Sequence, residues 1–166
     1  EGWKLLGNPY PSAINANSPA GTNNVLDANI PVIDPSYASV YIWDASANAY
    51  VAVNNSSAAK YIPPGQGFFL RARDNGYSAA ITRAMQTNMP TASYASLDTP
   101  WPEIRLKMEN PAGKSSTTSI RFHEGMTDGL DVTYDAGMLK HDSSFALYTN
   151  MQGHDNLDLM IQCFPE

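Results

Sequence analysis

The stretch Tyr61-Ile62-Pro63-Pro64-Gly65-Gln66-Gly67-Phe68-Phe69-Leu70-Arg71-Ala72 decides the fold. Its two prolines fix φ and remove two backbone donors, so regular structure cannot run through them. Gly65 and Gly67 permit positive φ or a close approach of the backbone. The aromatic run that follows ends at Asp74-Asn75-Gly76, which is a hairpin signal. The stretch predicts a tight turn, a buried strand and a return strand over residues 78–82.

Similar short apolar segments occur along the whole chain. We predict strands over residues 3–6, 38–44, 50–53, 104–109, 118–123, 145–149 and 157–163, separated by turns rich in Gly, Pro and Asn. Pro31 limits residues 30–33 to an edge strand. Alternation places Ile104, Leu106 and Met108 inward, and Arg105, Lys107 and Glu109 outward. No segment has a capped helical period over three turns, so the fold class is all-β, a jelly-roll-like β-sandwich.

The domain organisation follows from one irregular stretch in the middle of the chain. Residues 83–100 are irregular, and the clean alternation restarts after them. We predict a first β-subdomain over 1–85, a connecting or covering stretch over 86–102 and a second β-subdomain over 103–166. The alternative is a single sandwich over 1–166, since 166 residues suffice for one sizeable core.

The composition excludes several classes of function. The net charge of −6 and the lack of a Lys/Arg cluster argue against binding of nucleic acid or of an anionic membrane surface. No run approaches the roughly 18 apolar residues of a membrane-spanning helix. Cys163 is the only cysteine, which excludes a disulfide framework, and we predict that it is a core residue. Glu1 rather than Met opens the chain, so we expect a piece of a longer precursor.

Two groups of motifs resemble those of large secreted and cell-surface proteins of the Bacteroidetes. The first is the Gly-Trp-x-Leu-x-Gly-Asn-Pro-Tyr-Pro-Ser pattern of residues 2–12 with Gly-Gln-Gly-Phe-Phe at 65–69; the second runs from Arg121 to Asp131. The resemblance covers nearly the whole chain. In such proteins the region often precedes a sorting domain for type IX secretion. The resemblance implies export to the cell surface or medium and a non-catalytic accessory or adhesive role, with neighbouring domains of the same precursor as partners.

Aromatic residues are the candidates for ligand binding. Trp and Tyr stack on sugar rings through their apolar faces and hydrogen-bond to hydroxyls through their polar atoms. Tyr41, Trp43 and Tyr50 share one face of the hairpin over residues 38–53, and Trp101 lies in the connecting stretch. Val40 and Ile42 already supply an apolar face opposite Trp43. We predict a carbohydrate-binding patch at these four aromatic residues; a purely structural spacer is the alternative.

An acidic loop is the candidate metal site. Asp128, Asp131 and Asp135 lie within eight residues, with glycines nearby. Ca²⁺ requires six to eight oxygen ligands, and the spacing is not that of an EF-hand. A structural Ca²⁺ site is one interpretation, and aspartates that cap turns by hydrogen bonds to backbone amides are the other.

Catalysis is the least favoured interpretation. A polysaccharide-acting enzyme needs two facing carboxylates, for which Glu103, Glu109 and Glu124 are the candidates with strand neighbours. The serines lack a Gly-x-Ser-x-Gly motif. His123, His141 and His154 are not at the spacing of metal ligands. We therefore predict that the domain is not an enzyme.

Overall fold

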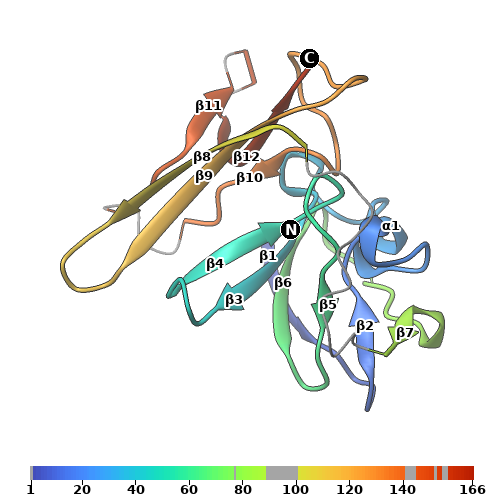
Figure 1. The fold of residues 1–166 in the computed structure, drawn as a ribbon. Helices are drawn as coiled ribbons and strands as arrows, with labels where there is room; N and C mark the ends of the chain where they lie inside the picture. Colours follow the sequence, from blue (N-terminus) through green and yellow to red (C-terminus); the bar gives the residue numbers. More distant parts are fainter. Residues whose placement is uncertain (1, 77, 89–100, 141–144, 152, 155–156) are drawn as a thin grey trace.

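The computed structural model of the chain describes residues 2–76, 78–88, 101–140, 145–151, 153–154 and 157–166. These residues form three β-sheets with short connecting helices (Figure 1). The two larger sheets pack against each other, so the protein is an all-β sandwich, as predicted. No helix in the described part of the chain is long and apolar enough to cross a membrane.

The first sheet is built around the stretch quoted above. Its strands are antiparallel in the order β1-β6-β3-β4, namely β1 Gly2–Gly7, β6 Gly67–Ala72, β3 Val40–Asp44 and β4 Ala49–Val53. Gly65 adopts a φ of 72° in the turn that leads into β6. Phe68 and Leu70 alternate with Phe69 along β6 and are buried in the first core, where they meet Val40 of β3.

A small sheet and a short helix close the far side of this first core. The sheet has the order β5-β2-β7, with β2 Ala13–Asn15, β5 Tyr61–Ile62 and β7 Gln86–Thr87. The helices are α1 Val25–Asn29 and the 3-10 turns Ser18–Ala20, Pro35–Tyr37 and Arg83–Met85. Ile14, Leu26 and Met85 from these elements are buried in the same core.

Buried asparagines hold the irregular loops in place. The Asn17 amide donates to the backbone oxygen of Asn54 at 2.8 Å and accepts from the backbone N–H of Lys60 at 3.0 Å. Asn24 caps α1 by accepting from the N–H of Asp27 at 2.8 Å. Asn29 donates to the carbonyls of Val25 and Ala80. These amides satisfy backbone groups that no strand or helix pairs, which allows Asn-rich loops to be buried.

The third sheet contains the second half of the chain. Its order is β10-β12-β9-β8, with β11 also paired to β12; the strands are β8 Glu103–Glu109, β9 Ser115–Phe122, β10 Ala136–Gly137, β11 Thr149–Met151 and β12 Leu157–Phe164. β9 and β12 run parallel, whereas the other pairs are antiparallel. The β8–β9 hairpin projects past the first sheet (Figure 1).

A second core joins the two large sheets. It contains Tyr41 and Ala52 of the first sheet and buried residues of the third, namely Ala136, Met138, Met160, Ile161 and Cys163. The Tyr41 hydroxyl donates to the carbonyl of Gly137 at 2.6 Å, and the Asn54 amide donates to that of Tyr134 at 2.5 Å. Cys163 is buried as predicted, and burial raises the pKa of its thiol to about 12.

Residues 30–33 follow α1 and contribute one bridge, between Ile33 and Ala72, which is within the limit that Pro31 sets. Three local predictions were wrong. Residues 78–82 form no strand. The strand predicted at 145–149 lies at Thr149–Met151. The faces of β8 are inverted: Ile104 and Leu106 are 52% and 47% exposed. The reason is that the projecting hairpin leaves its outer face uncovered and turns Arg105 and Lys107 toward β4.

Candidate functional site

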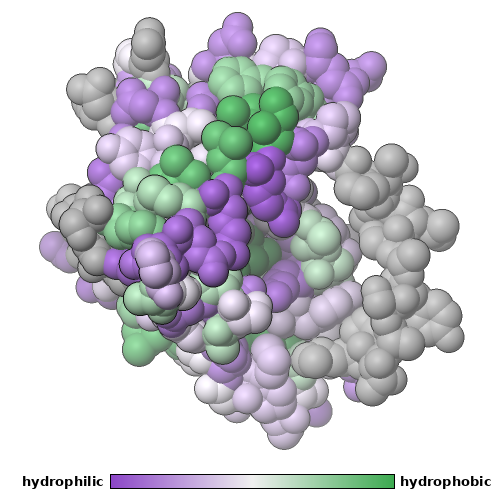
Figure 2. Space-filling view, turned by 60° about the vertical axis from the view of Figure 1, so that its left-hand side comes forward, coloured by the Kyte–Doolittle hydropathy of each residue, from purple (hydrophilic) through white to green (hydrophobic). Residues whose placement is uncertain are grey.

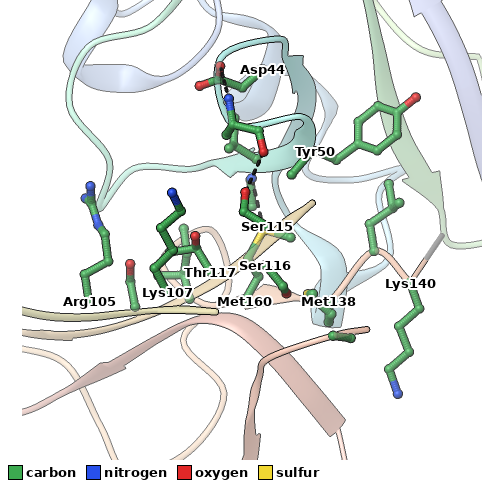
Figure 3. Close-up of a pocket in the computed structure, with 18 of the residues that line it drawn as sticks. Asp44, Tyr50, Arg105, Lys107, Ser115, Ser116, Thr117, Met138, Lys140 and Met160 are labelled. Atoms are coloured by element: carbon green, nitrogen blue, oxygen red, sulfur yellow. Dashed lines mark hydrogen bonds between the residues drawn. The ribbon is translucent and has the colours of Figure 1, made fainter. Parts of the chain in front are cut away.

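A cleft of about 350 Å³ separates the edge strand β4 from the inner face of the third sheet (Figure 3). On one side it is bounded by Tyr50 and Ala52 of β4, by Asp44 at the end of β3 and by Ala47 of the turn that follows. On the other side lie alternate residues of β8 and β9, which share one face of the sheet. Figure 2 shows hydrophilic side chains around a hollow in this side of the molecule.

The floor of the cleft is a row of hydroxyl groups. Ser115, Thr117 and Ser119 follow one another at every second position of β9, so they point to the same side of the strand. The Ser115 hydroxyl donates to the carbonyl of Ala47 at 2.5 Å and ties the β3–β4 turn to the third sheet. A sandwich usually has apolar residues at such positions. The polar row explains why the two sheets leave a cleft here.

Cationic side chains line the side of the cleft formed by β8. Arg105 lies opposite Ser119, and Lys107 lies opposite Thr117. Both extend toward the turn that holds Asp44, whereas the Lys140 side chain points away from it (Figure 3). Arg121 is largely buried at the same face, where it donates to the Ser56 hydroxyl at 2.7 Å and pairs with Glu103 at 3.1 Å.

Asp44 is the only carboxylate among the described residues that line this cleft. It accepts hydrogen bonds from the Ser46 hydroxyl at 2.6 Å and from the backbone N–H of Ser46 and Ala47. The Ser46 hydroxyl and the Ala47 N–H lower the pKa of Asp44. A general acid needs its pKa raised, so the described residues of the cleft do not form the carboxylate pair of a glycoside hydrolase.

The predicted glutamate candidates do not form such a pair either. Glu103 bonds to Arg105 and Arg121, Glu109 pairs with Lys107, and Glu124 is exposed. A second pocket, about 480 Å³, does contain two carboxylates, Asp34 and Asp158.

Both carboxylates of that second pocket are paired. Asp34 lies 3.2 Å from Arg71, and Asp158 pairs with Lys140. Partial burial raises the pKa of Asp158, but hydrogen bonds from Lys140 and Asn150 outweigh it and lower the pKa. This pocket therefore contains ion pairs rather than a proton donor poised for catalysis.

An exposed aromatic patch adjoins the first cleft. We use the term aromatic patch for Trp43, Tyr50 and Phe69. The rings of Trp43 and Tyr50 meet edge to face with centroids 5.0 Å apart, and those of Tyr50 and Phe69 are 5.5 Å apart. Trp43 is 39% exposed, and Leu5, the partner of Phe69 on β1, is exposed as well. Tyr50 belongs both to the patch and to the wall of the cleft.

The other two predicted aromatic residues lie elsewhere. Tyr41 is completely buried in the second core, so its ring is not available to a ligand and this part of the prediction was wrong. Trp101 is partly buried and stacks on His123 and Tyr134, with centroids 4.1 and 5.7 Å apart. It packs against the second core and does not join the aromatic patch.

The acidic loop forms a hydrogen-bonded turn. The Asp131 carboxylate accepts from the N–H and hydroxyl of Thr127, and the Asp135 carboxylate accepts from the N–H groups of Asp131 and Cys163 at 2.8 and 2.7 Å. Asp128 is exposed. The described residues contain no group of three or more His, Cys, Asp or Glu side chains placed to hold a metal ion. Calcium binding at this loop stays a prediction.

The carboxyl group of Asp135 has an unusual environment. Burial is the main cause that raises its pKa to about 6; the negative charge of Asp131 adds to the rise, and two N–H donors act in the opposite direction. The residue is fully buried beside the second core and next to the thiol-bearing Cys163. These contacts indicate a structural role.

Sequence reasoning missed the polar wall of the cleft. Arg105 and Lys107 were predicted to face solvent on the outside of the sandwich, and the hydroxyl row on β9 was not singled out. The available signal was the run of Ser and Thr over residues 115–119, where a strand facing a core is expected to be apolar.

Comparison with known proteins gives a family but no activity. A family model described as "Domain of unknown function (DUF8693)" matches residues 1–164. The chain belongs to this family. Searches of curated proteins and of solved structures gave no match.

Proposed function

We propose that this domain is a non-catalytic module that binds carbohydrate at the aromatic patch and the adjoining cleft, as part of an exported or cell-surface bacterial protein. The observation that carries the proposal is the pair of exposed Trp43 and half-buried Tyr50 beside a cleft lined with hydroxyl groups. The location outside the cell is inferred from the sequence resemblance.

The aromatic patch has the properties that sugar binding requires. The face of a pyranose ring is apolar and stacks on an aromatic ring, whereas its hydroxyl groups need hydrogen-bond partners. Trp43 and Tyr50 offer aromatic surface, and Tyr50 brings that surface to the edge of the cleft. Edge-to-face packing on Tyr50 and Phe69 limits the motion of these rings, which lowers the entropy lost on binding.

The cleft supplies the polar partners. Thr117, Ser119 and the charged side chains of β8 carry donors and acceptors on one face of the third sheet. A cleft of about 350 Å³ lies within the usual range for small ligands, so one or two sugar units can enter while the rest of a polysaccharide stays outside.

The experiment is affinity electrophoresis of the purified domain through gels that contain soluble neutral or anionic polysaccharides. We expect at least one polysaccharide to retard the wild type, and Trp43→Ala to abolish the retardation. Because Trp43 is part exposed, the loss of its ring contacts should cost only about 1 kcal/mol of stability, which a thermal melt would show.

The matched control is Tyr148→Ala, which removes an exposed aromatic residue that precedes β11, packs on Lys140 and does not belong to the aromatic patch. This variant should migrate like the wild type in every gel. Unchanged migration of the wild type across the whole panel would overturn the proposal and favour a structural spacer. An equal loss of retardation in Trp43→Ala and Tyr148→Ala would show that the aromatic patch is not the binding site.

A further inference from the structure

The charge of the chain is distributed unevenly, and the cleft lies on the cationic part. Residues 103–122, which form the β8–β9 hairpin, carry a net charge of +2, whereas the rest of the chain carries −8. Four of the ten Lys and Arg residues line the cleft, namely Arg105, Lys107, Arg121 and Lys140, and Asp44 is the one acidic lining residue in the described part of the chain.

The carboxylates that partner these cations are placed outside the cleft. Glu103 binds Arg105 at 2.7 Å, Glu109 pairs with Lys107, and neither of these carboxylates lines the cavity. Glu103 also pairs with Arg121, so two guanidinium groups share one carboxylate. Free donors on Arg105 and Lys107 therefore remain for a ligand that enters from the cleft side.

Arg105 and Lys107 are more exposed than Arg121. Their side chains are 60% and 55% exposed, whereas Arg121 is 11% exposed and its donors are used by Ser56, Ser57 and Glu103. Arg121 therefore fixes the hairpin to the loop that follows β4. Arg105 and Lys107 can rearrange toward a ligand, and their heads point to the Asp44 turn (Figure 3).

We propose that the cleft selects anionic polysaccharides, whose carboxylate or sulfate groups pair with Arg105 and Lys107 while a sugar ring stacks on Trp43 and Tyr50. This inference rests on the proposed function. A guanidinium group binds a carboxylate or sulfate through two parallel hydrogen bonds, and the ammonium group of Lys107 adds a second positive charge two residues along the strand. Tyr50 lines the same cleft as both cations, so one ligand can reach all three.

The test compares polygalacturonate, dextran sulfate, uncharged dextran, a neutral β-glucan and polyglutamate as ligands, by affinity electrophoresis and titration calorimetry. We expect the wild type to bind polygalacturonate or dextran sulfate, and the affinity to fall as salt is raised, because ions screen exposed charges. Preference between these two ligands distinguishes carboxylate from sulfate recognition. Weak or no binding of dextran and β-glucan supports the inference.

The decisive variant is Arg105→Gln with Lys107→Gln, which removes both charges but keeps a polar end on a shorter aliphatic chain. We expect about a tenfold or greater loss of affinity for the anionic polysaccharide, from the loss of charge-assisted hydrogen bonds. The matched control is Arg73→Gln with Arg83→Gln, two exposed arginines outside the cleft, which changes the net charge equally and should retain binding. Arg105→Lys with Lys107→Arg should also retain most of the affinity.

Several outcomes would overturn the inference. Binding of the neutral β-glucan that depends on Trp43 but not on Arg105 and Lys107 would keep the proposed function and remove the anionic preference. Equal losses in the two charge-removing double variants would show attraction to net charge alone. Binding of polyglutamate as tight as that of polygalacturonate would mean that the cleft recognises acidic chains without a sugar. Binding of no polysaccharide would remove the proposed function as well.

Discussion

Tyr41 and Trp43 are two residues apart on β3 and share one face of the first sheet, yet their environments differ completely. Tyr41 lies under the third sheet, where its hydroxyl donates to the carbonyl of Gly137. The centroids of its ring and of the Trp3 ring are 4.8 Å apart. Trp43 lies beyond the edge of that contact and is 39% exposed. The third sheet thus covers only part of this face, and the uncovered part is the aromatic patch.

The Asp135 carboxyl leads to a prediction about pH. In the folded protein its pKa is about 6, against an ordinary value of 3.8, so the folded state holds this proton more tightly than the unfolded state. Its contribution to stability is therefore complete below about pH 4 and is lost as the pH rises through 6. The shift corresponds to at most about 3 kcal/mol of unfolding free energy.

The measurement is urea unfolding of the wild type and of Asp135→Asn at several pH values between 4 and 7. Asparagine cannot ionise, so the difference in unfolding free energy between the two proteins isolates the titration of this group. We expect the advantage of the wild type to shrink as the pH rises. An advantage that grows with pH would mean that the N–H groups of Asp131 and Cys163 stabilise the carboxylate more than burial opposes it.

At the level of secondary structure, β8 has one face toward the cleft and the other toward solvent. Leu106 on its outer face is 47% exposed, whereas Leu159 on β12 is completely buried. We expect Leu159→Ala to cost about 2–5 kcal/mol of unfolding free energy, because it leaves a cavity in the core. Leu106→Ala should cost less than about 1 kcal/mol. Urea unfolding of both variants gives the comparison.

Leu159→Ala and Leu106→Ala remove the same atoms from a buried and from an exposed position, so the difference between their costs reports on burial alone. Equal costs would mean that the outer face of β8 is covered in solution, for example by association of two copies. Sedimentation of the wild type at increasing concentration would then show a species larger than the monomer.

The sequence predicts elements well where a strand is long and its neighbours are close in the chain. The segments around Phe68, Trp43 and Ile161 become strands as expected, because alternation and flanking turns are local properties. β2 and β7 were missed: Ile14 pairs with Ile62 and Gln86, and two- or three-residue strands so far apart carry no local pattern. Buried asparagines such as Asn17 look like surface-loop residues in the sequence.

The same limit applies to the candidate site. Trp43 and Tyr50 could be found because they belong to one hairpin and lie opposite each other in its register. Arg105 and Lys107 could not, because alternation tells which residues share a face but not which face meets another sheet. The cleft exists only after the two halves of the chain have packed together.

For the whole molecule, the open question is whether the two halves predicted from the sequence behave as separate domains. Contacts between the two halves include the second core and four hydrogen bonds whose distances are given above, donated by Tyr41, Asn54, Ser115 and Arg121. Ala52 and Met160 are also in contact across the interface. Removing either half would expose this core, so we predict that the halves unfold together in one transition.

Two tryptophan variants test this cooperativity. In Trp101→Phe, fluorescence reports on Trp3 and Trp43 of the first sheet; in Trp3→Phe with Trp43→Phe, it reports on Trp101, which stacks on Tyr134 beside the second core. Within each variant, we expect the fluorescence and circular-dichroism transitions in urea to coincide. Adding Tyr41→Phe to either background removes the buried bond to Gly137 and should lower the unfolding free energy by about 1–3 kcal/mol in both. Two separate transitions, or a loss of stability seen by only one set of tryptophans, would show that residues 1–85 and 103–166 are independent domains and that the cleft lies at a movable interface.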